Sequence, residues 1–510
     1  MRESRLENTT KNAFTGFFNQ LLNLVMSFIS RTVFIHYLGV EFLGISGLFS
    51  NILQILSMAD LGFNTAMVYS MYRPIANNDT QKLAALIAFY KKIYNIIAFA
   101  ILLIGLCLVP LLPYIVNTAT EIENLTIYYI LYLLNTVMSY LFVYKTALME
   151  AHQKSYILNN YDSVFIILQN IFQIAVLVFT SNFILYLLVQ IIVSFLKNFY
   201  KARKTEKMYP YIRSNAVLDK PERISIFQNV KSMFIYKIGG VLLNNTSNIL
   251  ISIIVNTITV GYYSNYLIII TAANTFMNIL FNSVTASLGN LNVSSDNEKQ
   301  YMYFKRINFF AVCIFSFVGI CFYLLLDDFI TIWLGPTFTL DKLSVLAISL
   351  NFVIPGTIRT VSLYRDTMGM FKDTKYVFFV TAVINIILSL LLGNVLGLAG
   401  VLFSTVIARI LTNAWFEPVV LFKNYLHRPV KEYFKRQLYY WVVFFIILVL
   451  TSFICSLITL QNLYVYFVVK TMVCVIISVG LLCIFYFKLS EFKYLLELFK
   501  TVLQKVIKKA

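Results

Sequence analysis

Six basic residues interrupt long apolar stretches of this 510-residue chain, and they are the side chains best suited to chemistry. They are Arg31, Lys237, Arg359, Arg365, Arg409 and Lys470. The same stretches hold few carboxylates, chiefly Asp60 and Glu417. A charged group inside a bilayer costs at least about 2.5 to 3.5 kcal/mol, so each needs a partner or a cavity. This cationic excess predicts binding of an anionic guest.

The elements that carry these residues are apolar helices. The chain is 59% hydrophobic and 13% charged, and its mean hydropathy is +0.77. A hydrocarbon core of about 30 Å needs roughly 20 apolar helical residues, and we count fourteen such runs between residues 12 and 487. The sequence therefore predicts an all-α integral membrane protein with about 14 transmembrane helices.

The distribution of basic residues predicts the orientation of these helices. Most of the 41 Lys and Arg residues fall in alternate gaps between the runs, whereas the other gaps hold only Lys342. Basic loops stay on the cytoplasmic side, so both termini are expected there. The same pattern accounts for most of the net charge of +18, which argues against a nucleic-acid partner.

No group of residues predicts an enzyme or a bound metal. His36, His152 and His427 are isolated, and no glycine-rich phosphate loop with Lys and Ser or Thr appears. The six cysteines all lie in apolar runs without metal-ligand spacing. We therefore expect no covalent catalysis and no cofactor, with proton or sodium coupling left open.

Arg31 and Arg359 are the first candidates for a binding site. Arg31 has apolar neighbours on both sides, and a water-filled interior with an anionic guest accounts best for its position. Arg359 follows Pro355 and Gly356, which are expected to break their helix midway.

The remaining charges have plainer interpretations. Arg365 beside Asp366, and Lys470 in the outer half of its helix, are expected to pair locally or to reach an interface. Asp60 is expected to pair with Arg31, or alternatively to carry a coupling proton or sodium ion.

Residues 32–79 carry a family resemblance. The segments YLG, LGISGLF and ADLGF within this stretch resemble the start of the Wzx-type flippases of the multidrug/oligosaccharidyl-lipid/polysaccharide exporter superfamily. The fourteen runs and the basic break after the sixth also match. The resemblance implies two six-helix lobes around a central cavity, with two extra C-terminal helices that help to form a groove for a prenyl tail.

The predicted organisation follows from these observations. It comprises an N-lobe at 1–200, a basic cytoplasmic linker at 201–225, a C-lobe at 226–425, helices 13 and 14 at 426–488, and an amphipathic basic helix at 489–510. The last helix is expected to lie on the inner leaflet, where each lysine near anionic lipid contributes on the order of 1 kcal/mol.

The resemblance also implies a function. Such flippases move undecaprenyl-diphosphate-linked oligosaccharide repeat units across the bacterial cytoplasmic membrane for capsule, exopolysaccharide or O-antigen assembly, beside a polysaccharide polymerase and glycosyltransferases. It supports Arg31 as a cavity arginine that faces the diphosphate or acidic sugars. For Arg359 and Arg409 the support is positional only, and Lys237 completes the expected set of cavity cations.

Three other functions remain open from sequence alone. A cation-coupled multidrug exporter of the same superfamily would need acidic cavity residues, which the cationic excess disfavours. A membrane polymerase or ligase would need a large outer loop, and none exceeds about a dozen residues. A scaffold that recruits glycosyltransferases through its basic tail would lose all function without residues 489–510.

Overall fold

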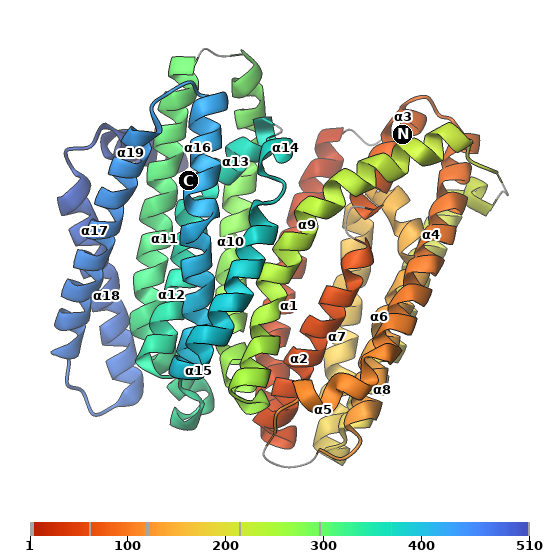
Figure 1. Ribbon diagram of the computed structural model, residues 1–510, viewed down its shortest axis with the longest axis horizontal. Helices are drawn as coiled ribbons and strands as arrows, with labels where there is room; N and C mark the ends of the chain where they lie inside the picture. Colours follow the sequence, from red (N-terminus) through yellow and green to blue (C-terminus); the bar gives the residue numbers. More distant parts are fainter. Residues whose placement is uncertain are drawn as a thin grey trace. The chain divides into compact units, whose positions relative to one another are not determined.

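The computed structural model describes residues 5–60, 63–118, 122–213, 216–294, 297–368 and 370–507. Within these ranges the chain is almost entirely helical and forms no strand (Figure 1). The backbone contacts divide it into two units, Met1–Ser264 and Asn265–Ala510.

The first unit holds the N-terminal helices and the beginning of α10. Its elements are α1 (Arg5–Leu38), α2 (Val40–Leu56), η1 (Ser57–Asp60), α3 (Phe63–Ala76), α4 (Thr80–Cys107), η2 (Val109–Leu111), α5 (Leu112–Ile115), α6 (Leu125–Ala151), α7 (Ser155–Thr180), α8 (Phe183–Met208), η3 (Pro210–Arg213), α9 (Lys220–Ile254) and the first turns of α10 (Thr257–Ser294).

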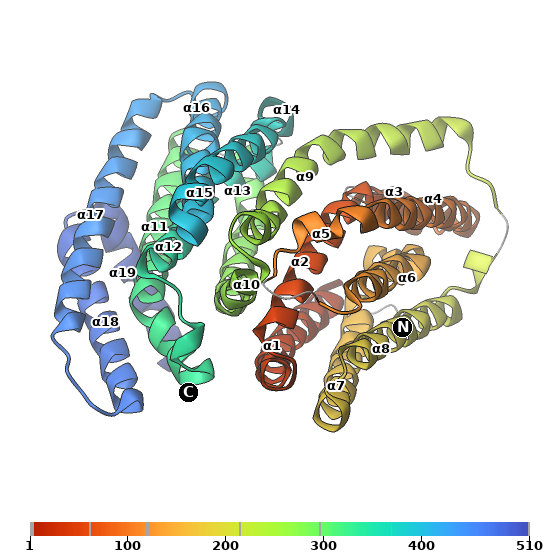
Figure 2. The same ribbon diagram turned by 60° about the horizontal axis from the view of Figure 1, so that its bottom comes forward.

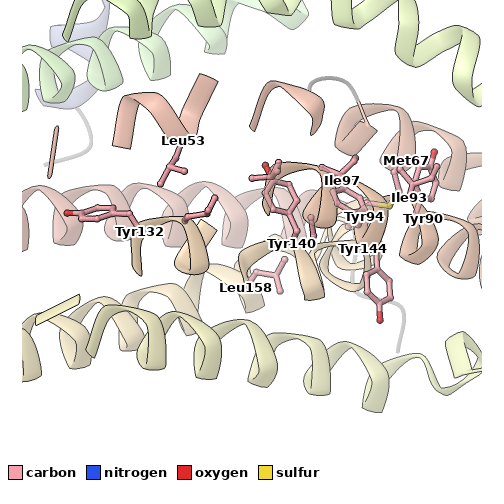
Figure 3. Close-up of a cluster of buried hydrophobic side chains, with 14 of the residues drawn as sticks. Leu53, Met67, Tyr90, Ile93, Tyr94, Ile97, Tyr132, Tyr140, Tyr144 and Leu158 are labelled. Atoms are coloured by element: carbon pink, nitrogen blue, oxygen red, sulfur yellow. The ribbon is translucent and has the colours of Figure 1, made fainter. Parts of the chain in front are cut away.

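Long helices of this unit pack in pairs, α1 with α7, α6 with α8, and α4 with α6 (Figure 2). Buried side chains from α2, α3, α4, α6 and α7 fill the space between them (Figure 3). Tyrosines are prominent in this cluster, and the rings of Tyr94 and Tyr140 stack with their centroids 6.1 Å apart. The hydroxyl of Tyr129 donates to the carbonyl of Gly105 at 3.1 Å, which satisfies a polar group that burial would otherwise leave unpaired.

The second unit holds the rest of α10 and the C-terminal helices. Its further elements are α11 (Asn297–Leu334), η4 (Pro336–Phe338), α12 (Lys342–Thr357), α13 (Arg359–Met368), α14 (Phe371–Thr374), α15 (Val377–Leu411), α16 (Asn413–Asn424), α17 (Val430–Ser456), α18 (Leu463–Tyr486) and α19 (Ser490–Ile507). The helix α11 contacts α12, α13, α17, α18 and α19, so it lies at the centre of this unit's packing.

Two breaks in the second unit have identifiable causes. The predicted interruption near Pro355 and Gly356 is confirmed, since α12 ends at Thr357 and α13 begins at Arg359. In α15, Gly397 adopts φ 58° and ψ −132°, a backbone conformation that a side chain would strain. A Cβ atom on Gly400 would lie 2.0 Å from the carbonyl oxygen of Leu392, so the chain reverses closely at this point.

Polar residues just before several helices set where those helices begin. The carboxylate of Asp79 accepts from the amide of Lys82 at 2.9 Å, and that of Asp341 accepts from the amide of Ser344 at 2.9 Å. The side chain of Asn462 accepts from the amides of Tyr464 and Val465 at 3.0 and 3.2 Å. Each of these caps satisfies amide groups that the first turn of a helix leaves without a partner.

Eleven helical segments of the described chain are long and apolar enough to cross a membrane, which makes this a multi-pass membrane protein. Two further apolar helices, Val40–Leu56 and Ile238–Ile254, are shorter, and the segment Val377–Asn424 contains the reversal at Gly397. The number fourteen, the six-helix lobes, the domain limits and the cytoplasmic position of the termini stay predictions.

One histidine at the end of α6 makes the stability of the first unit depend on pH. The ring of His152 stacks on that of Tyr209 with the centroids 4.5 Å apart. Burial, and secondarily the charge of Lys154, lowers the pKa of His152 from 6.5 to about 4. His152 therefore binds a proton below about pH 6.5 in the unfolded chain but only below about pH 4 in the folded chain. Between these two pH values, protonation favours the unfolded chain.

We therefore expect the melting temperature of the purified protein to fall as the pH decreases from 6.5 towards 4. The variant His152→Phe keeps a ring for the stack and loses the proton site, so its melting temperature should depend less on pH in this window. His36→Phe is the matched control. Equal pH slopes for the wild type and His152→Phe would contradict the assignment.

Candidate functional site

Arg31, on α1 in the first unit, has polar side chains around it although it lies within an apolar segment. Its Nη1 donates to Oγ of Ser264 at 2.7 Å, and that hydroxyl donates to the carbonyl of Gly261 at 2.7 Å. The phenol groups of Tyr132 and Tyr186 lie close enough to interact electrostatically with the guanidinium. Serine and tyrosine oxygens are neutral acceptors, and each is a weaker partner for a guanidinium than an anionic oxygen.

Arg359 begins α13 directly after the break that follows Pro355. Its Nη2 donates to Oδ1 of Asn282 on α10 at 3.1 Å, and both side chains are partly exposed within the second unit. The break determines this position, because α12 ends at Thr357 and only Ile358 lies between it and the arginine. The guanidinium is therefore held by a neutral amide at an interruption between two helices.

A charged cluster joins α13, α15 and α16 in the second unit. Nη1 of Arg365 donates to Oε1 of Glu417 at 2.7 Å, and its Nε donates to Oδ1 of Asp366 at 3.1 Å. Arg409 interacts electrostatically with the same Glu417. The local pairing predicted for Arg365 and Asp366 is confirmed, although the buried partner Glu417 binds the arginine at a shorter distance.

A second group of charges surrounds the end of α11, and the sequence analysis missed its carboxylates. Oδ2 of Asp327 accepts from Nζ of Lys342 at 2.8 Å, and Oδ1 accepts from the hydroxyl of Tyr266 at 2.7 Å. Oδ2 of Asp328 accepts from Nζ of Lys470 at 2.5 Å. Two adjacent carboxylates within an apolar run were the available signal, because the two lysines required partners of opposite charge.

An apolar cavity of about 590 Å³ opens in the second unit between α12, α15, α16 and α17. Its wall is mainly aromatic and aliphatic, with Trp415, Tyr433, Phe434, Gln437, Trp441 and Phe445 among its residues. Tyr433 also interacts electrostatically with Glu417. The charged cluster therefore lies next to one wall of an apolar cavity, an arrangement that suits a molecule with a charged part and an apolar part.

The predicted site residues differ in where they lie and in whether their side chains are described. It places Arg409 beside Arg365 and Glu417, and it places Arg359 six residues before Arg365 on α13. The side chains of Lys237 and Asp60 lie outside the described residues, so the pairing of Asp60 with Arg31 stays a prediction. In the part of the chain that the structure describes, no group of three or more His, Cys, Asp or Glu side chains could hold a metal ion.

Comparison with solved structures identifies the fold. The inward closed conformation of the lipid II flippase MurJ superposes with a TM-score of 0.64 at 17% identity, covering 94% of this chain and 99% of that chain. An inward-facing multidrug resistance MATE family transporter of the MOP superfamily gives 0.56 at 12% identity over 77% of this chain and 92% of that one. The Vibrio cholerae MATE transporter VcmN gives 0.55 at 14% identity over 82% and 99%.

The chain has the fold of MOP superfamily transporters. No protein-family model matches the sequence, and no curated protein matches it. The similar structures named here are transporters and a flippase. The Wzx-type assignment is a finer statement than the fold supports.

The charged cluster predicts a sharp difference between its two carboxylates. Glu417→Gln removes the buried partner of Arg365 and should destabilise the protein by roughly 3 to 5 kcal/mol, because the buried guanidinium would be left with the more exposed carboxylate of Asp366 as its counter-charge. Asp366→Asn is the matched control, since the Asp366 side chain is 44% exposed and should cost less than about 1 kcal/mol. Thermal unfolding in detergent measures both, and equal losses would contradict the cluster's role.

Proposed function

We propose that this protein is a flippase for undecaprenyl-diphosphate-linked oligosaccharide repeat units. It would move them from the inner to the outer leaflet of the bacterial cytoplasmic membrane for capsule, exopolysaccharide or O-antigen assembly. No bond is made or broken in this reaction, so the protein's task is to hold an anionic head group and an apolar tail together. The observation that carries the proposal is the apolar cavity beside the charged cluster of the second unit.

The cavity supports a lipid-like substrate through its shape and its lining. A volume of about 590 Å³ accommodates several isoprene units of a prenyl chain, and its wall is formed by residues such as Trp441 and Phe445. Aromatic and aliphatic side chains offer dispersion contacts along a hydrocarbon tail. Gln437 and Tyr433 are polar groups in the same wall, and Tyr433 lies towards the buried Glu417.

The arginines support an anionic head group. Arg31 and Arg359 donate to a hydroxyl and to an amide oxygen, which are weaker acceptors than a phosphate oxygen. A guanidinium can bind a diphosphate through two parallel hydrogen bonds, so it fixes orientation as well as charge. One of the proteins with this fold is itself a lipid II flippase, and alternating exposure of a fixed site is how transporters built from repeated helical units move a substrate.

A second candidate is a multidrug exporter. The cavity has two tryptophans, Trp415 and Trp441, in its wall, and flat aromatic surfaces also suit planar apolar drugs. One of the similar structures is a multidrug resistance MATE family transporter, and another is a MATE transporter. This candidate requires an acidic group that faces the drug, and Glu417 is instead engaged by Arg365.

The flippase proposal predicts that Arg31→Met abolishes export, because it removes the guanidinium proposed to bind the diphosphate. Arg31→Lys should retain only part of the activity, since an ammonium keeps the charge without the paired donors. The measurement is made in the host depleted of the native protein and complemented with each variant. In cells complemented with Arg31→Met, lipid extraction should show accumulated undecaprenyl-diphosphate-linked repeat units. These units should be shielded from a glycan-cleaving probe that is added outside the cells before extraction.

The control is Arg203→Met, an exposed basic residue at the cytoplasmic end of α8 according to the predicted orientation. It should leave export unchanged while the protein level in the membrane stays equal for all variants. Normal export by Arg31→Met would remove Arg31 from the mechanism. If depletion raised drug sensitivity and no lipid-linked repeat unit accumulated, the exporter would replace the flippase. Accessible but unpolymerised repeat units would indicate a polymerase.

A further inference from the structure

Five of the chain's six cysteines lie on three helices of the second unit. Cys313 and Cys321 are on α11, Cys455 is on α17, and Cys474 and Cys483 are on α18. The helices α11 and α18 pack against each other along their length, and α17 packs against both. The cysteines therefore gather along one helix seam rather than being scattered through the apolar runs.

Three contacts fix the register of α11 against α18. Near the C-terminal end of α11, the ring centroids of Phe329 and Phe467 lie 6.3 Å apart. Asp328 beside them forms an ion pair with Lys470 of α18. Towards the N-terminal end of α11, the ring centroids of Phe309 and Tyr486 lie 5.2 Å apart. Positions on α11 decrease as those on α18 increase, so the two helices run antiparallel. This register brings the cysteines of one helix opposite those of the other.

Cys321 and Cys474 face each other directly in this register. Their sulfur atoms are 3.9 Å apart, within the distance of a weak S–H···S hydrogen bond. Cys474 is fully buried and Cys321 is partly exposed. A disulfide needs its sulfurs about 2.05 Å apart, so the two sulfur atoms must approach each other by roughly 2 Å for the bond to close. Cys313 and Cys483 interact two turns further along the same seam.

We propose that Cys321 and Cys474 form an oxidisable thiol pair that a lipid hydroperoxide converts into a disulfide joining α11 to α18. The sulfur of Cys321 attacks the terminal peroxide oxygen, the O–O bond breaks, and an alcohol leaves with the thiol's proton. The resulting sulfenic acid is attacked by the sulfur of Cys474, which forms the S–S bond and releases water. Two thiols are oxidised and one hydroperoxide is reduced to an alcohol.

A disulfide between Cys321 and Cys474 would restrict the movement of helices next to the apolar cavity. The helix α18 follows α17 in sequence and packs against it, and α17 forms one wall of the apolar cavity through Tyr433, Trp441 and Phe445. A covalent bond between α18 and α11 would restrict movement of the α17–α18 pair relative to the rest of the unit. The closed loop spans 153 residues, and long loops favour stabilisation by a cross-link. This inference holds for any substrate of the protein.

The test uses the full-length protein in lipid nanodiscs treated with cumene hydroperoxide. Free thiols are then blocked with N-ethylmaleimide, and the digested protein is analysed by mass spectrometry with and without dithiothreitol. We expect a cross-linked peptide that contains Cys321 and Cys474 and disappears on reduction, together with a melting temperature that rises by a few degrees and returns on reduction. Cys474→Ser should remove both effects.

Controls separate this proposal from simple packing of small apolar side chains. Cys107→Ser, on α4 of the first unit, should leave the cross-link intact, and Cys474→Ala should abolish it while preserving the melting temperature of the reduced protein. Should Cys474→Ser fail to fold, Cys321→Ala provides the equivalent test. The proposal is overturned if both thiols remain reactive towards N-ethylmaleimide, if they end as sulfinic or sulfonic acids without a cross-link, or if Cys474 pairs with another cysteine.

Discussion

The high cost of an uncompensated charge in hydrocarbon determines how the second unit is assembled. Asp327 links the end of α11 to Lys342 at the start of α12, and Asp328 links the same turn to Lys470 on α18. Glu417 links α13 to α16 through Arg365. Because each charge requires its partner at hydrogen-bond distance, the pairs fix which helices are neighbours and at what depth they meet. Apolar packing then fills the space between helices whose register is already fixed.

The two kinds of arginine environment differ in what a ligand could gain. Arg365 donates to two carboxylates, so an incoming anion would have to displace charged acceptors. Arg31 and Arg359 donate to the neutral oxygens of Ser264 and Asn282. An anion displaces such acceptors at lower cost because a charge-assisted hydrogen bond is roughly twice as strong as a neutral one. Under the proposed function, Arg365 is therefore a structural arginine, and Arg31 and Arg359 bind the head group.

Local sequence signals predicted the helices and their interruptions. Pro355 and Gly356 predicted a helix break, which the structure has between α12 and α13. These features depend on backbone geometry within a few residues. The partners of the charges depend on lateral packing between distant segments, which explains why Asp327 and Asp328 were overlooked and why Ser264 could not be assigned to Arg31. The cysteine seam was hidden for the same reason, since its pairs become visible only when α11 and α18 are aligned.

In the proposed flippase, the apolar cavity and the arginines would contribute differently to binding a lipid-linked molecule. A hydrocarbon tail leaving the bilayer for the cavity exchanges one apolar environment for another, so the hydrophobic effect gives it little net driving force. Close contacts with side chains such as Trp441 and Phe445 add dispersion energy but also order the tail. The head group moves from water to fixed donors in a medium of lower dielectric constant, where each charge-assisted bond is stronger. If the protein is the proposed flippase, affinity and substrate choice therefore depend on the cations, and the cavity determines where the tail lies while the head group crosses.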